Sequence, residues 1–289
     1  MKKIFNDQID ALIYNYFTQS VEEEKIADLI NSNQFCYSDL EERYLWLKNM
    51  NIDPNIIHLD ENHKSIYEIF DKCNEMFNAN NIEYYYTSGI LSYLLINKNL
   101  QRYHHDLDIF VNMKDLEKLE QVCGDYGFIF KRQLGDRGDG TNRIMLKMYY
   151  ENAEDIPITV FMYVRHFDNT IVQNDYYLDD NKPYVERIYN SPTVVNLSFS
   201  NEPKYHNDIK YFAITLEALY ISKMGNRPKD IYDCTQFEKY LDLDKLKKLE
   251  NELTKNKAND VLDANNDQYY DFIFSEFMSM QKVLTNGRL

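Results

Sequence analysis

The chain has 289 residues and a formal net charge of −15, from 47 acidic and 32 basic residues. Its hydrophobic content of 44% and aromatic content of 15% are typical of a folded globule and exclude a disordered chain. No run of lysine and arginine offsets the acidity, so a nucleic-acid partner is disfavoured, and a neutral or cationic small molecule suits the surface better.

The four cysteines are far apart and form no C-x-x-C pair. Isolated thiols in a chain of this length predict a reducing, cytoplasmic location rather than a disulfide framework or a zinc site. The first ten residues, MKKIFNDQID, lack the apolar run of a signal peptide. No apolar stretch is long enough to span a membrane, so we expect no membrane partner.

The first eighty residues predict a helical leader. Apolar residues recur at helical spacing over 9–31 and again over 63–78. Ser38 and Glu41 resemble a capping box at the start of a helix that runs through Leu47. We expect this leader, residues 1–80, to pack on the domain that follows.

Residues 84–111, YYYTSGILSYLLINKNLQRYHHDLDIFV, are the stretch around which the rest is organised. They predict a strand over 82–87, a tight turn, a helix over 90–96, a loop and a second strand. Ser88 and Gly89 form the turn that opens the helix. Free N–H groups at a helix start bind phosphate, and glycine lets a phosphate approach the main chain closely.

The second strand carries Asp106 and Asp108. Because side chains alternate along a strand, these two carboxylates share one face, and the intervening apolar residues face the core. Two adjacent carboxylates repel each other unless a cation lies between them. Few carboxylate ligands, completed by water and phosphate, are typical of a Mg²⁺ site.

The remaining chain predicts one more strand-rich part and then helices. A helix over 115–126, ended by Gly127, precedes a strand over 128–134 and a connection over 135–140. Strands over 143–150 and 156–164 are expected to form a hairpin, with further β segments at 184–189 and 193–199. Helices are expected from residue 215 onward, over 230–241, 244–256 and 268–284, with Pro228 in a first helical turn. The predicted fold is α+β, with a mixed central sheet over 81–205 between the helical leader and a C-terminal helical bundle over 206–289.

Two motifs have competing interpretations. The tripeptide at Asp242–Asp244 repeats the D-x-D pattern, but it lies between two predicted helices, where it is interpreted as a cap. Lys223 precedes Asp230 and Asp233 in SKMGNRPKDIYD. This segment is either a helix–helix turn with structural aspartates, or a device by which Lys223 reaches a triphosphate as a point charge.

Taken together, the motifs T-S-G-x-L, R-x-H-x-D-L-D-I and a late K with R-x-K-D-x-x-D resemble the nucleotidyltransferase superfamily of the DNA polymerase β type. The closest similarity is to lincosamide and aminoglycoside nucleotidyltransferases, and the abortive-infection toxin nucleotidyltransferases are similar as well. The resemblance covers residues 82–241. It implies a central sheet of the nucleotidyltransferase type and the metal-dependent transfer of a nucleoside monophosphate from NTP to a hydroxyl, with release of pyrophosphate.

The resemblance also implies residue roles. Two Mg²⁺ ions are expected on the metal ligands Asp106 and Asp108. Nucleotide binding is expected at Ser88 and Gly89 of the phosphate turn, at the basic positions Arg102 and His104, and at Lys223.

The sequence departs from the family pattern at two places. The turn reads Ser-Gly where Gly-Gly or Gly-Ser is usual, and Thr159 occupies the expected place of a third carboxylate. Asp155 is the nearest acid and therefore the first candidate for the general base. The expected acceptor is a small molecule such as an antibiotic. The alternatives are a toxin that modifies tRNA and a nucleotide-binding protein that has lost transfer activity.

Overall fold

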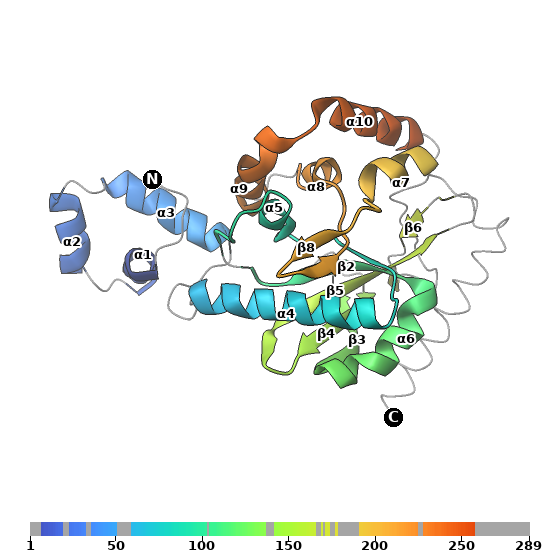
Figure 1. Ribbon diagram of the computed structural model, residues 1–289. Coiled ribbons are helices and arrows are strands. Elements are labelled where there is room, and N and C mark those ends of the chain that lie inside the picture. Colours follow the sequence, from blue (N-terminus) through green and yellow to red (C-terminus); the bar gives the residue numbers. More distant parts are fainter. Residues whose placement is uncertain are drawn as a thin grey trace.

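The computed structural model describes residues 7–19, 23–32, 36–50, 59–102, 104–136, 142–165, 169, 171–173, 177–178, 191–224 and 228–257. At its centre lies a mixed sheet in the order β1-β2-β5-β4-β3 (Figure 1). These strands are β1 (Tyr84–Tyr86), β2 (Leu107–Asn112), β5 (Ala153–Arg165), β4 (Asn142–Tyr150) and β3 (Phe128–Asp136). Within this path only β2 and β5 are parallel, and the other neighbours are antiparallel. The predicted α+β class with a mixed sheet is confirmed.

Short strands and helices complete the described domain. The strands β6 (Ile171–Gln173) and β7 (Tyr177–Leu178) pair with β5 and β4, and β8 (Lys204–His206) pairs with β9 (Ile209–Tyr211). The helices are α4 (Leu59–Ala79), α5 (Leu91–Leu94), α6 (Leu116–Val122), α7 (Pro192–Ser198), α8 (Leu216–Ser222), α9 (Pro228–Phe237) and α10 (Leu243–Lys257). Single 3₁₀ turns are η1 (Met113–Asp115), η2 (Cys123–Tyr126) and η3 (Glu238–Tyr240).

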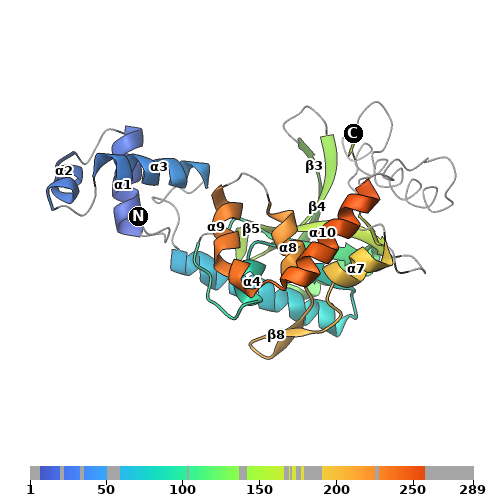
Figure 2. The ribbon, with the colours of Figure 1, turned by 90° about the horizontal axis from the view of Figure 1, so that it is seen from above.

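Helices lie on both sides of the sheet. In Figure 1, α4 and α6 run along the lower side, whereas α7, α8 and α10 lie above it. Figure 2, seen from above, shows α10 beside α7 and α8. The α4 side chains Phe70 and Phe77 pack on Tyr86 and Tyr84 of β1, with ring centroids 4.6 and 4.4 Å apart. The face of β1 that carries Tyr84 and Tyr86 is therefore covered by α4.

Three N-terminal helices, α1 (Asp7–Gln19), α2 (Glu23–Asn31) and α3 (Tyr37–Asn49), have a small core of their own around Ile13, Ile26 and Leu40. A buried, bidentate ion pair of Arg43 with Asp10 joins α3 to α1. Figures 1 and 2 place these helices to one side of the sheet. By contrast, α4 contributes to the main core. The domain boundaries expected at residues 80 and 205 stay predictions.

The strand that carries the predicted metal ligands shows the expected alternation. Leu107, Ile109 and Val111 are fully buried, while Asp108 is half-buried. The predicted helix end at Gly127 is confirmed as well, since Gly127 has a φ of 77° and lies in the left-handed region that glycine tolerates. Pro228 opens α9, as expected of proline in a first turn.

Two local predictions were wrong. Residues 193–199 were expected to form a β segment, but 193–198 belong to α7, and Phe199 alone forms a β-bridge, with Ile214. The Ser191 hydroxyl accepts a hydrogen bond from the Val194 N–H and Pro192 occupies the first turn, so a good helix start outweighs the β-branched residues. The capping box is also shifted, because α3 begins after Cys36, whose N–H donates to Asp39 rather than to Glu41.

Several expected elements lie outside the described residues: the β segment over 184–189, the helix over 268–284 and most of the connection over 135–140. Among the helices that the structure describes, none combines the length and the apolar character needed to cross a membrane.

The cap of α7 can be tested by unfolding. Ser191→Ala leaves the Val194 N–H without its side-chain acceptor and should lower the free energy of unfolding by about 1 kcal/mol. Ser191→Asp keeps an acceptor and should preserve stability. Urea denaturation of the three proteins provides the measurement, and equal midpoints for all three would contradict the assigned cap.

Candidate functional site

The predicted phosphate turn and the predicted metal ligands lie together at one end of the sheet. Tyr86 of β1 pairs with Ile109 of β2, so the chain leaves β1 where β2 begins. The Thr87 N–H donates to the Asp108 carbonyl at 3.0 Å. The Ser88 hydroxyl lies 3.5 Å from the Asp106 carbonyl. The main chain thus joins the turn directly to the segment that carries both aspartates.

The two aspartates are accessible enough to bind a ligand. Asp106 directly precedes β2, Asp108 is its second residue, and both side chains are half-buried. Among the described residues, no group of three or more His, Cys, Asp or Glu side chains surrounds a common metal position. The residues present fit a Mg²⁺ ion held by two carboxylates, because such an ion keeps several water ligands and takes others from substrate phosphates.

The strand register shows which residue lies where the family resemblance led us to expect a third carboxylate. Thr159 on β5 is the Cα partner of Asp108, and Lys147 on β4 is the partner of Thr159. Across the sheet from Asp108, the next side chains in the row are therefore the hydroxyl of Thr159 and the ammonium of Lys147. Asp155 lies four residues earlier on β5, about 13 Å along the strand from Thr159. Its side chain lies outside the described part, and its role as a base stays a prediction.

A buried carboxylate, Asp233, organises the cations around the turn. Arg102 donates from Nε and Nη2 to its two oxygens, each at 2.7 Å. Lys223 Nζ lies 2.7 Å from Asp233 Oδ2 and 3.4 Å from Asp230 Oδ1. The Tyr93 hydroxyl donates to Asp233 Oδ1 at 3.2 Å. We call Arg102, Lys223, Asp230 and Asp233 the ion cluster.

The electrostatics of the ion cluster follow from burial and pairing. Asp233 is fully buried, which raises the pKa of its carboxyl, but the charges and hydrogen bonds of Arg102 and Lys223 outweigh burial and lower that pKa overall. Burial lowers the pKa of the Arg102 guanidinium, and the Asp233 charge raises it above its ordinary value. Two formal positive charges thus face two formal negative charges, and the ion cluster is neutral.

Gly89 is required at its position for lack of space. A Cβ atom at Gly89 would lie 2.5 Å from Arg102 Nη2 and 3.3 Å from Asp233 Oδ2. The guanidinium therefore packs against the Cα side of the glycine backbone. The N–H groups of Ser88, Gly89 and Ile90 donate to no described carbonyl, so they remain able to bind an anion.

His104 lies within this region as an uncharged group. Its side chain is buried, and burial first, with the Arg102 charge second, lowers the pKa of the imidazole well below its usual range. Its Nε2 atom has no hydrogen-bond partner among the described residues. The Asn62 amide holds the His104 backbone on both sides, at 2.9 and 3.0 Å. His104 can donate or accept one hydrogen bond, and its role in nucleotide binding stays a prediction.

The sequence located most of these residues but missed how they pair. Asp233 was assigned to local structure on its helix, whereas its main partner, Arg102, is 131 residues away. Tyr93 was read only as a residue of the helix after the turn. No spacing in the chain links these positions, so only the fold reveals the ion cluster.

Comparison with known proteins gives fold similarities only. No protein-family model matches the chain, and no curated protein matches it. Among solved structures, the chain is similar to the lincosamide antibiotic adenylyltransferase LnuA in its lincomycin-bound form, with 21% identity, a TM-score of 0.40, and coverage of 61% of this chain and 95% of that chain.

Two structures of ANT(2'')-Ia are similar as well, each at 10% identity. The solution structure of this antibiotic-resistance factor has a TM-score of 0.43 and covers 68% of this chain and 95% of that chain. The complex with adenylyl-2''-tobramycin has a TM-score of 0.45 and covers 67% of this chain and 99% of that chain. LnuA and ANT(2'')-Ia are nucleotidyltransferases, the superfamily that the sequence motifs resemble. Since the identities and TM-scores are low, nothing about the substrate of this chain follows from them.

The ion cluster should dominate the stability of this region. Asp233→Asn leaves two buried cations short of one carboxylate and should lower the free energy of unfolding by about 3–5 kcal/mol at neutral pH. The lowered pKa of Asp233 adds a pH dependence. Its contribution is complete above the unfolded-state pKa of about 3.9 and is lost as the pH falls through the lower folded-state value.

Urea denaturation at pH 7 and at pH 3 measures both effects. The wild-type protein should lose more stability than Asp233→Asn on this pH change. Asp242→Asn is the control, because Asp242 is exposed and caps α10, where asparagine is an equally good cap. An Asp233→Asn protein as stable as Asp242→Asn at pH 7 would contradict the assigned role.

Proposed function

We propose that the protein transfers a nucleoside monophosphate from an NTP–Mg²⁺ complex to a hydroxyl group of a small molecule, with release of pyrophosphate. The observation that carries this proposal is the joining of the Ser88–Gly89 turn to Asp106 and Asp108 at one end of the sheet. A triphosphate needs both partners at once, since its oxygens bind backbone N–H groups and divalent cations.

The roles of the residues follow from their surroundings. Asp106 and Asp108 would hold Mg²⁺, and the two carboxylates offset the charge of one ion, so that a second would depend mainly on the triphosphate. The metal would stabilise charge on the entering and leaving oxygens of an in-line displacement. The N–H groups of Ser88 and Gly89 would bind the β and γ phosphates, and Asp106 and Asp108 would position the α-phosphate through the Mg²⁺ that they hold.

Arg102 and Lys223 have a different role in this proposal from the one expected from the motifs. Both already pair with Asp233, and their charges are balanced within the ion cluster. They would hold the Gly89 backbone against α9. Their positive charges would also reduce the electrostatic repulsion between the phosphates and the buried aspartates of the ion cluster. Such preorganised charges act without reorganising at the moment of reaction.

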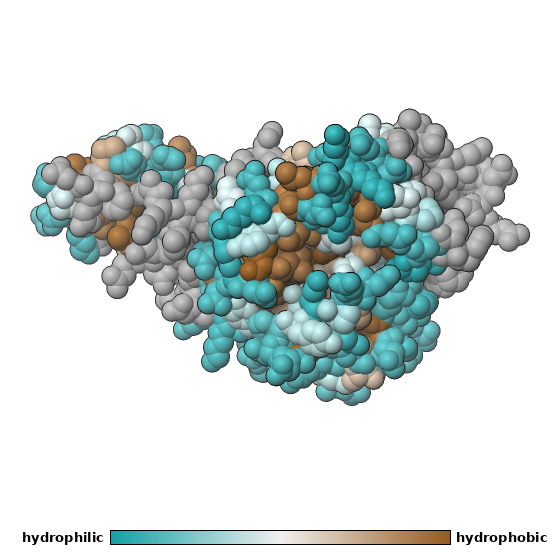
Figure 3. All heavy atoms as spheres, turned by 45° about the horizontal axis from the view of Figure 1, so that its top comes forward, coloured by the Kyte–Doolittle hydropathy of each residue, from teal (hydrophilic) through white to brown (hydrophobic). Residues whose placement is uncertain are grey.

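The acceptor is proposed to be a small molecule of the antibiotic type. The face shown in Figure 3 has a hollow in which hydrophobic residues gather, with hydrophilic residues around it. Ligand sites are typically concave and mostly apolar, with a few polar groups that fix orientation. A tRNA acceptor, the alternative, would meet a chain with a net charge of −15.

Nucleotide binding without transfer is the second candidate function. The observation that favours it is Thr159, a neutral residue in the row beside Asp108. Both candidates predict that NTP with Mg²⁺ raises the melting temperature, as a ligand of the native state must. Only the first predicts that pyrophosphate is released when an acceptor is present.

The metal site is tested by charge-neutral substitution. Asp106→Asn and Asp108→Asn should each abolish Mg²⁺-dependent turnover of labelled NTP, because a neutral amide oxygen binds Mg²⁺ more weakly than a carboxylate and does not offset its charge. Their melting temperatures without ligand should match the wild type, since both side chains are half-buried and the core residues are unchanged.

Asp242→Asn, in the second D-x-D tripeptide, is the matched control and should keep wild-type turnover. Pyrophosphate release and mass spectrometry of candidate acceptors report the reaction. Normal turnover in Asp106→Asn or Asp108→Asn would refute the metal site. Nucleotide added to tRNA, with every small molecule unchanged, would favour the toxin alternative.

The third-carboxylate position is tested by restoring an acid. Thr159→Asp places a carboxylate beside Asp108 and should raise turnover by roughly tenfold or more, since a general base typically contributes about 10²–10⁴-fold. Thr159→Asn is the uncharged control and should not raise it. If Asp155 is the base, Asp155→Asn should lower turnover while the thermal shift with NTP remains. A Thr159→Asp protein no faster than Thr159→Asn would contradict the assignment of this position.

A further inference from the structure

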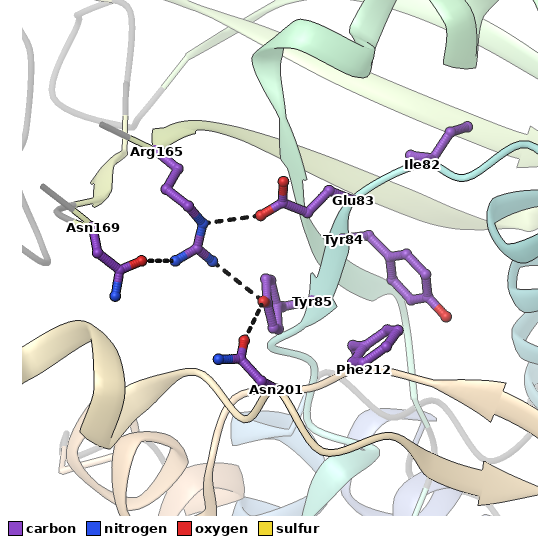
Figure 4. A pocket seen from close by; sticks show the side chains of 8 residues that line it. All are labelled: Ile82, Glu83, Tyr84, Tyr85, Arg165, Asn169, Asn201 and Phe212. Carbon is purple, nitrogen blue, oxygen red and sulfur yellow. Dashed lines mark hydrogen bonds and ion pairs between the residues drawn. The ribbon is translucent and has the colours of Figure 1, made fainter. Parts of the chain in front are cut away.

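A cavity of about 460 Å³ lies at the other end of β1, away from the Ser88–Gly89 turn (Figure 4). Tyr85 of β1 lines it, together with Glu83, the residue before β1, and Arg165, the last residue of β5. Asn201 and Phe212 close it from the segments around the β8–β9 hairpin. It is built from different residues than the candidate functional site.

Among the described residues that line this cavity, Glu83 is the one carboxylate, and it has no hydrogen-bonding capacity left. Glu83 Oε1 accepts from the Tyr163 hydroxyl at 2.8 Å and from Arg165 Nε at 3.0 Å. Glu83 Oε2 accepts from Lys114 Nζ at 2.8 Å and from Asn112 Nδ2 at 3.0 Å. A carboxylate offers about four acceptor positions, and all four are used. A ligand therefore finds no acceptor at Glu83.

The donors of the cavity, in contrast, are only partly used. Arg165 donates to Glu83, from Nη1 to Asn169 at 2.6 Å, and from Nη2 to the Tyr85 hydroxyl at 3.2 Å. A guanidinium has five N–H donors, so two have no partner among the described residues. The Tyr85 hydroxyl donates to Asn201 Oδ1 at 3.2 Å, which turns the oxygen of this exposed amide inward and leaves its N–H₂ group without a described partner. The cavity therefore offers a ligand the hydrogen-bond donors of Arg165 and Asn201.

The charges around Glu83 are paired, so it is the unused donors, rather than a net positive charge, that favour an anion. Burial raises the pKa of Glu83, but hydrogen bonds from Lys114, Tyr163 and Arg165 lower it to about 2, so this residue carries one negative charge at neutral pH. Arg165 and Lys114 place two positive charges on it. Lys210 Nζ lies 5.4 Å from the centre of the Phe212 ring. Asp115 Oδ2 also accepts from the Glu83 N–H at 2.9 Å, and the charged residues among the described lining are Glu83 and Arg165, one of each sign.

Aromatic rings form the other wall. Phe212 meets Tyr84 and Tyr85 edge to face, with ring centroids 6.0 and 6.2 Å apart. Tyr84 and Tyr85 are buried, and their positions are fixed by β1. A flat apolar group can pack on such a wall without reordering it, which keeps the cost of binding low.

We propose that this cavity binds a small aromatic anion, with its carboxylate or phosphate at Arg165 and Asn201 and its ring against Phe212. Charge-assisted hydrogen bonds to a guanidinium supply the strongest polar contacts in such a site. The site is independent of the proposed transferase activity, because none of its residues belongs to the turn, to the aspartates or to the ion cluster.

The test uses four probes of similar size in isothermal titration: benzoate, phenyl phosphate, neutral benzamide and cationic benzylamine. The two anions should bind at least tenfold more tightly than the other two. Comparison of benzoate with phenyl phosphate identifies which anionic group the cavity prefers. Benzamide that binds as tightly as benzoate, or no binding by either anion, would overturn the proposal.

Asn201→Asp is the decisive variant. It keeps the oxygen that accepts from Tyr85, replaces the two amide donors by a negative charge, and lies at an exposed position where folding tolerates the change. It should weaken anion binding at least tenfold, and Arg165→Gln should do the same. Unchanged affinity in Asn201→Asp would refute the site.

Two matched controls separate this site from other effects. Arg132→Gln removes another arginine that pairs with a glutamate, Glu120, at 2.7 Å and at similar exposure, and it should leave anion binding unchanged. Asp106→Asn should also leave it unchanged, even though it abolishes the proposed turnover. Loss of probe binding in Asp106→Asn would show that the anions bind at the nucleotide site instead.

Discussion

The buried carboxylate of Asp233 is the contact on which the candidate site depends. It binds Arg102 from the loop before β2, Lys223 from the end of α8 and Tyr93 from α5, so one side chain on α9 joins three separate segments. Removing one partner of a buried ion pair leaves an uncompensated charge, which is costly. The geometry of the Gly89 turn, against which Arg102 packs, is therefore tied to α9 and not only to its own strand and helix.

This arrangement constrains the chemistry at the site. Because the ion cluster is neutral, Arg102 and Lys223 have no surplus charge for a triphosphate that carries several negative charges. In the proposed reaction, that charge must be met by Mg²⁺ on Asp106 and Asp108 and by the N–H groups of Ser88 and Gly89. The neutral imidazole of His104 fits the same pattern, since a charged one would be a further buried cation beside Arg102. The pairing of Arg102 and Lys223 with Asp233 therefore supports the proposed metal dependence, in addition to the two aspartates.

Local sequence signals predicted what depends on local physics. The alternation of Leu107, Asp108 and Ile109 and the end of a helix at Gly127 follow from side-chain direction and backbone freedom. Thr159 was placed beside Asp108 from the family pattern, and the register agrees. The segment over 193–199 was mistaken for a strand because its β-branched residues outweighed Ser191 and Pro192 in the prediction. The pairing of Arg102 with Asp233 could not be predicted, since contacts between distant segments depend on how the helices pack on the sheet.

The two ends of β1 differ in the groups that they offer to a ligand, and this difference explains why different ligands are proposed for them. At the end toward Asp108, the proposed reaction brings the triphosphate in together with Mg²⁺ on Asp106 and Asp108. At the end toward Glu83, the carboxylate is already saturated and Arg165 retains donors, so an anion needs no metal. Tyr85 is only three residues from Ser88, about 10 Å along an extended chain, yet the paired strands keep the two charge patterns apart. A short strand whose residues all pair with β2 therefore separates the proposed metal site from the proposed anion site.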